Sequence, residues 1–259
     1  MKIILNLLLL FSFMNSLSAQ KESTFERAED AFSSFQYEEA KALYTTLLIE
    51  GDEEWNYYIY YRRAYCYYGL ERLDEALKDA RKALGITSKH EDYIEVKGRS
   101  FWLMASIYSE RGNHEKSIEY LGYAAKISDD SYILNNIGYS QLKAGQYAAA
   151  LESLNKALEL NIENAYVFSN RSFAYLKLGA LEEAQDDIKK ALAFNPYNPY
   201  AYKYQAMIYL ELKEMDKACE ALTKAKELGY ENFGLGRVAD AQEVNDLIKE
   251  HCTTSKEGE

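Results

Sequence analysis

One sequence pattern recurs six times along this chain and constrains its fold more than any other feature. Its copies begin at residues 35, 71, 112, 145, 179 and 213, and each copy carries a small residue at the same place: Ala40, Ala76, Ser117, Ala150, Ala184 and Ala218. A second small residue precedes each of these by twelve positions: Ala28, Ala64, Ala105, Gly138, Ser172 and Ala206. Two helices cross closely only where their side chains are small, so each pair predicts a helix-turn-helix hairpin.

The composition agrees with an all-helical chain. Only two prolines, Pro196 and Pro199, interrupt 259 residues, and 48% of the residues are hydrophobic, which is enough for a sizeable core. The 30 basic residues are outnumbered by 41 acidic ones, which gives a formal net charge of -11. A phosphate backbone would be repelled on average, so we do not expect nucleic acid as a partner.

The repeated segments resemble the tetratricopeptide repeat family, whose repeat is 34 residues long. The best match is NRSFAYLKLGALEEAQDDIKKALAFNP, residues 170–196, and the resemblance extends over roughly residues 21–230. It implies an all-α, right-handed superhelical solenoid of about six repeats. We expect the solenoid over residues 20–237, with repeats near 21–54, 57–90, 98–130, 131–164, 165–198 and 199–232.

Two further segments follow from the spacing and polarity of the chain. The 41 positions from Ala76 to Ser117 exceed one repeat, so the first helix of the third repeat should begin about two turns early. After the sixth repeat, residues 238–251 place Val238, Ala241, Val244, Leu247 and Ile248 on one side, which predicts a capping helix at the end of the stack. Residues 252–259 form a polar tail.

The first nineteen residues have the pattern of a secretory signal peptide. Lys2 precedes an apolar run from Ile3 to Met14, and small residues lead to a cleavage point after Ala19 or, as an alternative, after Ser18. A run of this length is too short to span a bilayer, so we expect no stable membrane insertion after cleavage. The pattern predicts an exported protein, in the periplasm or outside the cell.

The chain shows no constellation of residues that would support catalysis. The Gly234–Gly236 stretch lacks the further glycine of a nucleotide loop, and the acidic pair Asp186–Asp187 is expected on a solvated helix face. The three histidines are isolated from one another: His90, His114 and His251. We therefore predict no enzyme activity, no catalytic residue, no metal site and no cofactor.

A site known in some members of the resembled family can be tested residue by residue. Those members bind the acidic carboxyl end of chaperones through lysine, asparagine and arginine on three consecutive repeats. Asn170 matches the middle asparagine, but the flanking repeats offer Asn135 and Tyr139, then Tyr200 and Tyr204, in place of the cations. A carboxylate would lose water without gaining a partner there, so we do not expect chaperone-tail binding.

The resemblance also indicates which side chains line a groove. In the family's superhelix, the first helix of each repeat faces the concave side through its second, fifth, ninth and twelfth positions. Those positions hold mostly aromatic residues here: Tyr58, Tyr61, Tyr65, Tyr68, Trp102, Tyr132, Asn135, Tyr139, Tyr166, Phe173 and Tyr200. Tyrosine is over-represented where partners bind, although some of these rings could instead only pack between helices. For Tyr60 and Tyr67, at core-facing positions, packing between helices is the expected role.

Two of the three cysteines are predicted to pair. Cys219 begins the second helix of the last repeat and Cys252 follows the capping helix, which should run antiparallel to it, so the two can meet. The same arrangement resembles the end of other secreted bacterial tetratricopeptide proteins, and export provides an oxidising compartment. Cys66 is expected to be a buried free thiol.

These observations predict a non-enzymatic scaffold that binds a protein or peptide partner in a concave aromatic groove. Two alternatives stay open: a glycan- or peptidoglycan-binding module, because aromatic rings also suit the apolar faces of sugars, and an architectural subunit of an envelope complex. The sequence indicates neither the partner's identity nor the oligomeric state.

Overall fold

The computed structural model describes residues 21–49, 55–90, 92–229 and 237–252. Every regular element within these ranges is a helix, which confirms the predicted all-α class. The expected signal peptide and most of the polar tail lie outside the described residues. None of the described helices is long and apolar enough to cross a membrane.

The chain divides after Ile107 into two compact units, and the division falls inside helix α5. The first unit contains two helical hairpins and most of α5: a helix over residues 21–33 with α2 (Tyr37–Ile49), α3 (Asn56–Gly69) with α4 (Leu73–Gly85), then α5 (Tyr93–Glu110). Helix α5 starts five residues before the expected repeat boundary at 98, which is somewhat less than the two turns predicted from the spacing.

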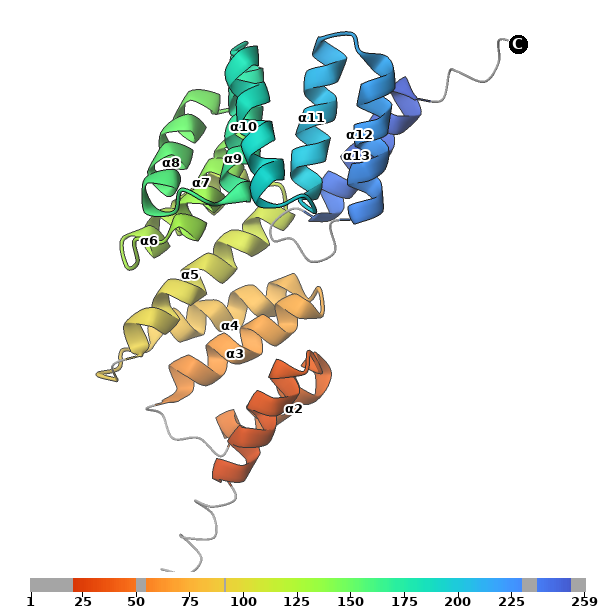
Figure 1. The fold of residues 1–259 in the computed structure, drawn as a ribbon. Coiled ribbons are helices and arrows are strands. Elements are labelled where there is room, and N and C mark those ends of the chain that lie inside the picture. The colour runs from red at the N-terminus through yellow and green to blue at the C-terminus, as the bar shows by residue number, and fades with distance from the viewer. Residues whose placement is uncertain (1–20, 50–54, 91, 230–236, 253–259) are drawn as a thin grey trace, which may run out of the picture. The chain divides into compact units, whose positions relative to one another are not determined.

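The second unit contains the remaining helices, which Figure 1 shows as successive hairpins. They are α6 (His114–Ala125), α7 (Ser131–Lys143) with α8 (Tyr147–Leu160), α9 (Ala165–Lys177) with α10 (Leu181–Phe194), α11 (Pro199–Glu211) with α12 (Met215–Leu228), and α13 (Arg237–His251). Helices α7, α9 and α11 contact one another in order, and α13 runs beside α12.

In two hairpins of the second unit, contacts place the small residues where the two helices cross, as the sequence predicts. All twelve are buried. At Gly138, a Cβ atom would come within 2.6 Å of Leu154 Cγ on the facing helix. In the next hairpin the Ser172 hydroxyl donates a hydrogen bond to the carbonyl oxygen of Ala184, its partner small residue, at 2.7 Å. Close contact of the backbones therefore sets the repeat spacing that is visible in the sequence.

In each of two hairpins, a buried ion pair at an equivalent position joins the first helix to the second. Arg63 of α3 binds both carboxylate oxygens of Asp79 on α4, at 2.6 and 3.1 Å. Arg171 of α9 binds Asp187 of α10 in the same way, at 2.7 and 2.9 Å. The expectation of a solvated Asp186–Asp187 face is therefore wrong for Asp187, whose exposure is 2%, because the arginine sixteen residues earlier pairs with it inside the hairpin.

The last helix is fixed at its end by a disulfide. Cys219 on α12 and Cys252 after α13 are bonded, with their Cα atoms 5.6 Å apart, and they are the pair expected from the sequence. Cys66 is a free, buried thiol, and burial raises its pKa to about 12. A thiol in that state is nearly unionised at neutral pH and is a poor nucleophile.

Candidate functional site

The seven tyrosines of α3 divide between two faces of one helix. Tyr58, Tyr61, Tyr65 and Tyr68 recur every three or four residues and share one face, as helical periodicity requires. We call this surface, together with Phe25 and Phe32 of the helix over residues 21–33, the inner face of the first unit, because it is formed by the first helices of hairpins. Tyr60 and Tyr67 lie on the other face of α3, toward α2 and α4.

The four rings on the inner face form an unbroken row. Successive ring centroids are 6.5, 6.5 and 6.2 Å apart, and each ring stands edge-on to the next. This spacing lies within the range in which aromatic pairs attract each other. Tyr61 is buried, whereas the other three rings remain half-buried and so keep part of their surface available.

Neighbouring helices hold this row of rings on both sides. Phe32 contacts Tyr65, with centroids 5.4 Å apart, and Phe25 lies 5.9 Å from Tyr58. On the other side, α5 brings Arg99 toward Tyr61: burial raises the pKa of Tyr61, and the Arg99 charge opposes that rise. Phe25, Phe32 and Arg99 therefore support the row from the neighbouring helices.

A polar cluster around Glu29 fixes one end of the row. The Glu29 carboxylate accepts hydrogen bonds from Tyr44 at 2.6 Å and from Tyr58 at 3.1 Å, and it pairs with Arg62. Arg62 Nε donates to the Tyr58 hydroxyl at 2.7 Å, and its guanidinium carbon lies 4.2 Å from the Phe32 ring centroid. Burial raises the pKa of Tyr58 to about 12, so its hydroxyl keeps its proton at neutral pH.

The tyrosines of the opposite face have a different environment. Tyr60 and Tyr67 are half-buried and flank Arg63, which lies 5.6 and 5.9 Å from their ring centroids. They pack between helices, as predicted, beside cations, and Tyr60 also packs against a cluster of buried apolar side chains. Tyr57 was not singled out from the sequence, yet it is fully buried and donates a hydrogen bond to Asp92 at 2.6 Å. That contact depends on a residue 35 positions away, which no local pattern indicates.

The remaining groove candidates differ in their exposure. Trp102 of α5 is half-buried, as are Tyr166 and Phe173 of α9, while Tyr132 of α7 is 46% exposed. In contrast, three candidates of the second unit are buried: Asn135, Tyr139 and Tyr200. The Tyr200 ring contacts both Tyr139 and Tyr166, with centroids 6.4 Å away in each case, so α7, α9 and α11 bring these side chains together.

Helix α13 accounts for the burial of Tyr139. Its Asp240 side chain is fully buried and accepts a hydrogen bond from the Tyr139 hydroxyl at 2.7 Å. Lys143 of α7 and Lys203 of α11 each lie 2.7 Å from the same carboxylate. The helix predicted to cap the end of the stack thus also contacts α7 and α11, the first helices of two hairpins.

The electrostatics of this cluster favour a charged carboxylate. Burial alone would raise the pKa of Asp240, but Lys203 and Lys143 outweigh it and hold the pKa below its ordinary value. The pKa of Glu243 is lowered by the same two lysines against a similar effect of burial. Burial and the Asp240 charge raise the pKa of Tyr139 well above its ordinary value, so Tyr139 remains a hydrogen-bond donor.

Two cations therefore lie on this surface. Lys203 stands at the fifth position of its helix, one of those expected to face the groove, whereas Lys143 stands at none of them. The comparison with a chaperone-binding clamp considered only the positions that the clamp uses, and Lys143 and Lys203 stand elsewhere in their helices. The side-chain amide of Asn170 is buried and donates a hydrogen bond to Asn135 at 2.9 Å.

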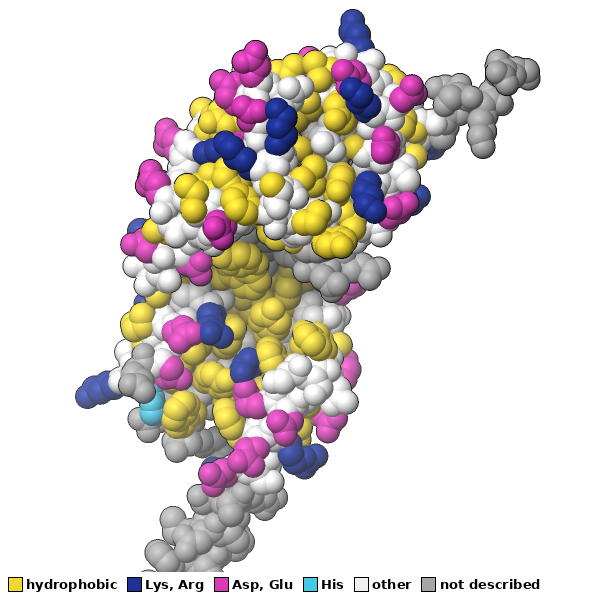
Figure 2. All heavy atoms as spheres, viewed as in Figure 1, with side chains coloured by type: hydrophobic (Ala, Val, Ile, Leu, Met, Phe, Trp, Pro, Cys, Tyr) yellow, Lys and Arg dark blue, Asp and Glu magenta, His cyan; other side chains and the backbone are white. Residues whose placement is uncertain are grey.

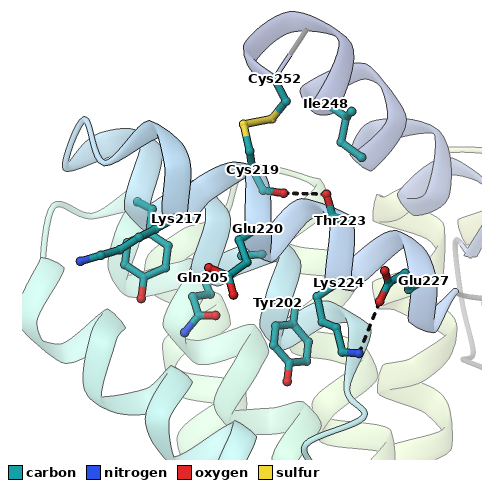
Figure 3. Close-up of a pocket in the computed structure, with 12 residues that line it drawn as sticks. Tyr202, Gln205, Lys217, Cys219, Glu220, Thr223, Lys224, Glu227, Ile248 and Cys252 are labelled. Atoms are coloured by element: carbon teal, nitrogen blue, oxygen red, sulfur yellow. Dashed lines mark hydrogen bonds and ion pairs between the residues drawn. A yellow bond between two sulfur atoms is a disulfide. The ribbon is translucent and has the colours of Figure 1, made fainter. Parts of the chain in front are cut away.

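A separate depression of about 970 Å³ lies beside the disulfide. Figure 3 shows Tyr202 of α11 and Lys224 of α12 at its wall, and Lys224 pairs with Glu227 at 3.4 Å. Figure 2 shows acidic and basic side chains interspersed over the visible part of the second unit. No group of three or more metal-ligating side chains occurs among the residues that the structure describes.

The hairpins and their shared register define a helical-repeat protein. Family models described as tetratricopeptide repeat match residues 25–91 together with 169–231, and residues 98–130; a model described as TPR repeat matches residues 138–179. The chain belongs to the tetratricopeptide repeat family.

Solved structures of this family share the fold at low sequence identity. TTC0263, a thermophilic TPR protein in Thermus thermophilus, is 19% identical with a TM-score of 0.55, over 74% of this chain and 100% of that one. MamA from Desulfovibrio magneticus RS-1 is 18% identical with a TM-score of 0.54, over 69% and 96%. YrrB, described as a TPR protein with an unusual peptide-binding site, is 18% identical with a TM-score of 0.52, over 77% and 97%. Among curated proteins, none matches this sequence.

Proposed function

We propose that the protein is an exported, non-enzymatic scaffold that binds a segment of a partner protein on the inner faces of its repeats. The observation that carries this proposal is the row of Tyr58, Tyr61, Tyr65 and Tyr68, which is supported by neighbouring helices and half-buried along most of its length. Rigid rings with hydroxyl groups give apolar contact and hydrogen bonds at a small entropic cost.

The arrangement of the rings favours a protein segment over a sugar. Neighbouring rings are inclined by 67–70°, so no two neighbours form one flat stacking platform. A pyranose stacks on an exposed flat ring face, whereas an extended peptide or a helix can place side chains between inclined rings. In the second unit, the side chains proposed to contact the ligand are Tyr132, Asn135, Tyr139, Tyr166, Phe173 and Tyr200. Three of them, Asn135, Tyr139 and Tyr200, are buried, and Tyr139 is hydrogen-bonded to α13.

A paired substitution tests this site without removing a buried residue. Tyr65→Ala with Tyr68→Ala removes two half-buried rings from the inner face. Tyr60→Ala with Tyr67→Ala makes the same change on the opposite face. We expect the first variant to lose capture of its partner from envelope extract, at least tenfold, and the second to retain it. Equal loss in both variants, with equal loss of helical signal, would show that these tyrosines only stabilise the fold. Retained binding to immobilised cell-wall glycans, with no protein captured, would favour the glycan alternative.

Export is part of the proposal and has its own readout. We expect the mature chain, isolated from its own cells, to begin at Gln20 after cleavage at Ala19. N-terminal sequencing of the envelope fraction would show this, and an intact Met1 would contradict it.

A further inference from the structure

Two lysines of the second unit form ion pairs with carboxylates of α13. Lys203 is 1% exposed and lies 2.7 Å from Asp240 and 3.3 Å from Glu243. Lys143 makes the same two contacts at the same distances. Tyr139 completes the cluster by donating to the second oxygen of Asp240. Three side chains from α7 and α11 thus converge on acidic groups that stand one helical turn apart.

We propose that this cluster of Tyr139, Lys143 and Lys203 is a binding site for an acidic amphipathic helix of a partner protein, and that α13 is its intramolecular occupant. The inference deepens the proposed function, since it names the chemistry of a partner segment for the second unit. It uses residues separate from the tyrosine row of α3, so the two proposals fail independently.

Charge complementarity restricts what can replace α13. A buried ammonium group without a carboxylate loses its hydration and gains nothing in return, which is costly. An apolar or basic helix would leave Lys203 in that state. The occupant must therefore carry acidic side chains at positions i and i+3, as Asp240 and Glu243 do.

The apolar part of the site adds a second requirement. Val244 is 1% exposed and belongs to the core of the second unit, and Leu247 packs against that core. With Asp240 and Glu243, these residues occupy positions i, i+3, i+4 and i+7 of one helical stripe. A matching partner helix carries two acidic residues followed by two apolar ones with this spacing.

The way α13 is held makes exchange with a partner feasible. Among its described side chains, residues 240–251, only Asp240 and Val244 are buried. Ala241, Leu247 and Ile248 are only partly buried against the core. A terminal helix with one fully buried apolar side chain among those described opens more readily than the core helices. The Cys219–Cys252 disulfide keeps its end close to α12, which maintains a high effective concentration of the helix at the site. Loss of the disulfide should therefore favour an external competitor.

A labelled peptide of residues 237–251, RVADAQEVNDLIKEH, probes the site directly in the full-length mature protein. Asp240→Asn with Glu243→Gln in the protein should raise its affinity for the peptide at least tenfold over the unmodified chain, because the resident helix no longer pairs with the lysines. Adding Lys203→Met should abolish this gain, and so should the same two substitutions placed in the peptide. Tyr60→Ala with Tyr67→Ala, on the face of α3 opposite the tyrosine row, should leave peptide binding unchanged.

Three results would overturn the inference. No peptide binding by any variant with unchanged helical circular dichroism would make α13 a permanent part of the fold. Binding that is insensitive to the carboxylates would reduce the site to an apolar surface. Dimerisation of the Asp240→Asn/Glu243→Gln variant, called the acid-free variant, would mean that a second copy of this chain, and not a partner protein, binds at the lysines.

A second measurement applies if the acid-free variant does not fold. In the Cys219→Ser/Cys252→Ser chain, the amide hydrogens of α13 should exchange at least tenfold faster than those of α12. Equal rates in the two helices would contradict a displaceable α13.

Discussion

At the scale of single residues, the turn of each hairpin contains one position with a left-handed backbone. Gly112, Gly145 and Gly179 occupy it in three hairpins, and Phe35, Glu71 and Lys213 occupy it in the others with φ of 58°, 60° and 60°. These six positions are also where the repeated sequence pattern begins. A residue with a Cβ atom is strained in this conformation, whereas glycine is not.

We expect Lys213→Gly to stabilise the protein by about 1 kcal/mol, because the strain outweighs the extra freedom that glycine gives the unfolded chain. Urea unfolding followed by circular dichroism measures the change. Gly179→Ala is the matched control, with an expected loss of about 1 kcal/mol. A destabilised Lys213→Gly protein would show that its side chain contributes more than the backbone strain costs.

The Arg171–Asp187 pair predicts a larger effect. Arg171→Leu leaves the Asp187 carboxylate, 3% exposed, without its two-point partner, and Lys190 at 3.8 Å is too far to replace it. We expect a loss of about 3 kcal/mol, since breaking one side of a buried pair strands the other charge. The double variant Arg171→Leu/Asp187→Leu should recover part of this loss in the same urea experiment. No recovery would indicate that packing of the arginine chain, and not its charge, is what matters.

At the scale of helices, the sequence predicts the hairpins well because their determinants are local. Small residues at a fixed separation mark each crossing point, and all of them are buried. The docking of α13 could not be predicted in the same way. In the sequence, Asp240 has no feature that distinguishes it from other acidic residues. Its partner Lys143 is 97 positions earlier and comes close to it only when the hairpins stack. Periodicity identifies an apolar face, but it does not say which surface that face will cover.

The pairing of α13 predicts how stability depends on pH. Asp240 and Glu243 have lowered pKa values in the folded protein, so the stability they contribute is present above their ordinary values of 3.8 and 4.5 and is lost as the pH falls through the folded values. The urea midpoint should fall more steeply below about pH 4.5 in the unmodified protein than in the Asp240→Asn/Glu243→Gln variant. The pKa of His114 is lowered by burial and by Lys143, and Asp240 opposes that effect, so His114→Gln is placed in both chains to remove this difference. Parallel profiles would mean that these ion pairs do not stabilise the docked helix.

At the scale of the whole molecule, the two units differ in whether the proposed binding residues are already paired within the chain. The first unit presents a row of half-buried tyrosines, and the second has its lysines occupied by its own last helix. The family and its periodicity indicated which helix faces to consider as a binding surface. They could not separate exposed candidates such as Tyr132 from buried ones such as Tyr139, because that difference depends on α13.

Site-specific photocrosslinking in the native cell tests most directly whether the tyrosine row is a binding surface. A benzophenone side chain placed at Tyr65 is compared with the same group at Tyr67, which lies on the opposite face of α3 and is equally half-buried. The account predicts a discrete crosslinked protein species from position 65, absent from position 67 and lost when Tyr68→Ala is added. Crosslinks of equal yield from both positions, or a species formed from position 67 alone, would contradict it.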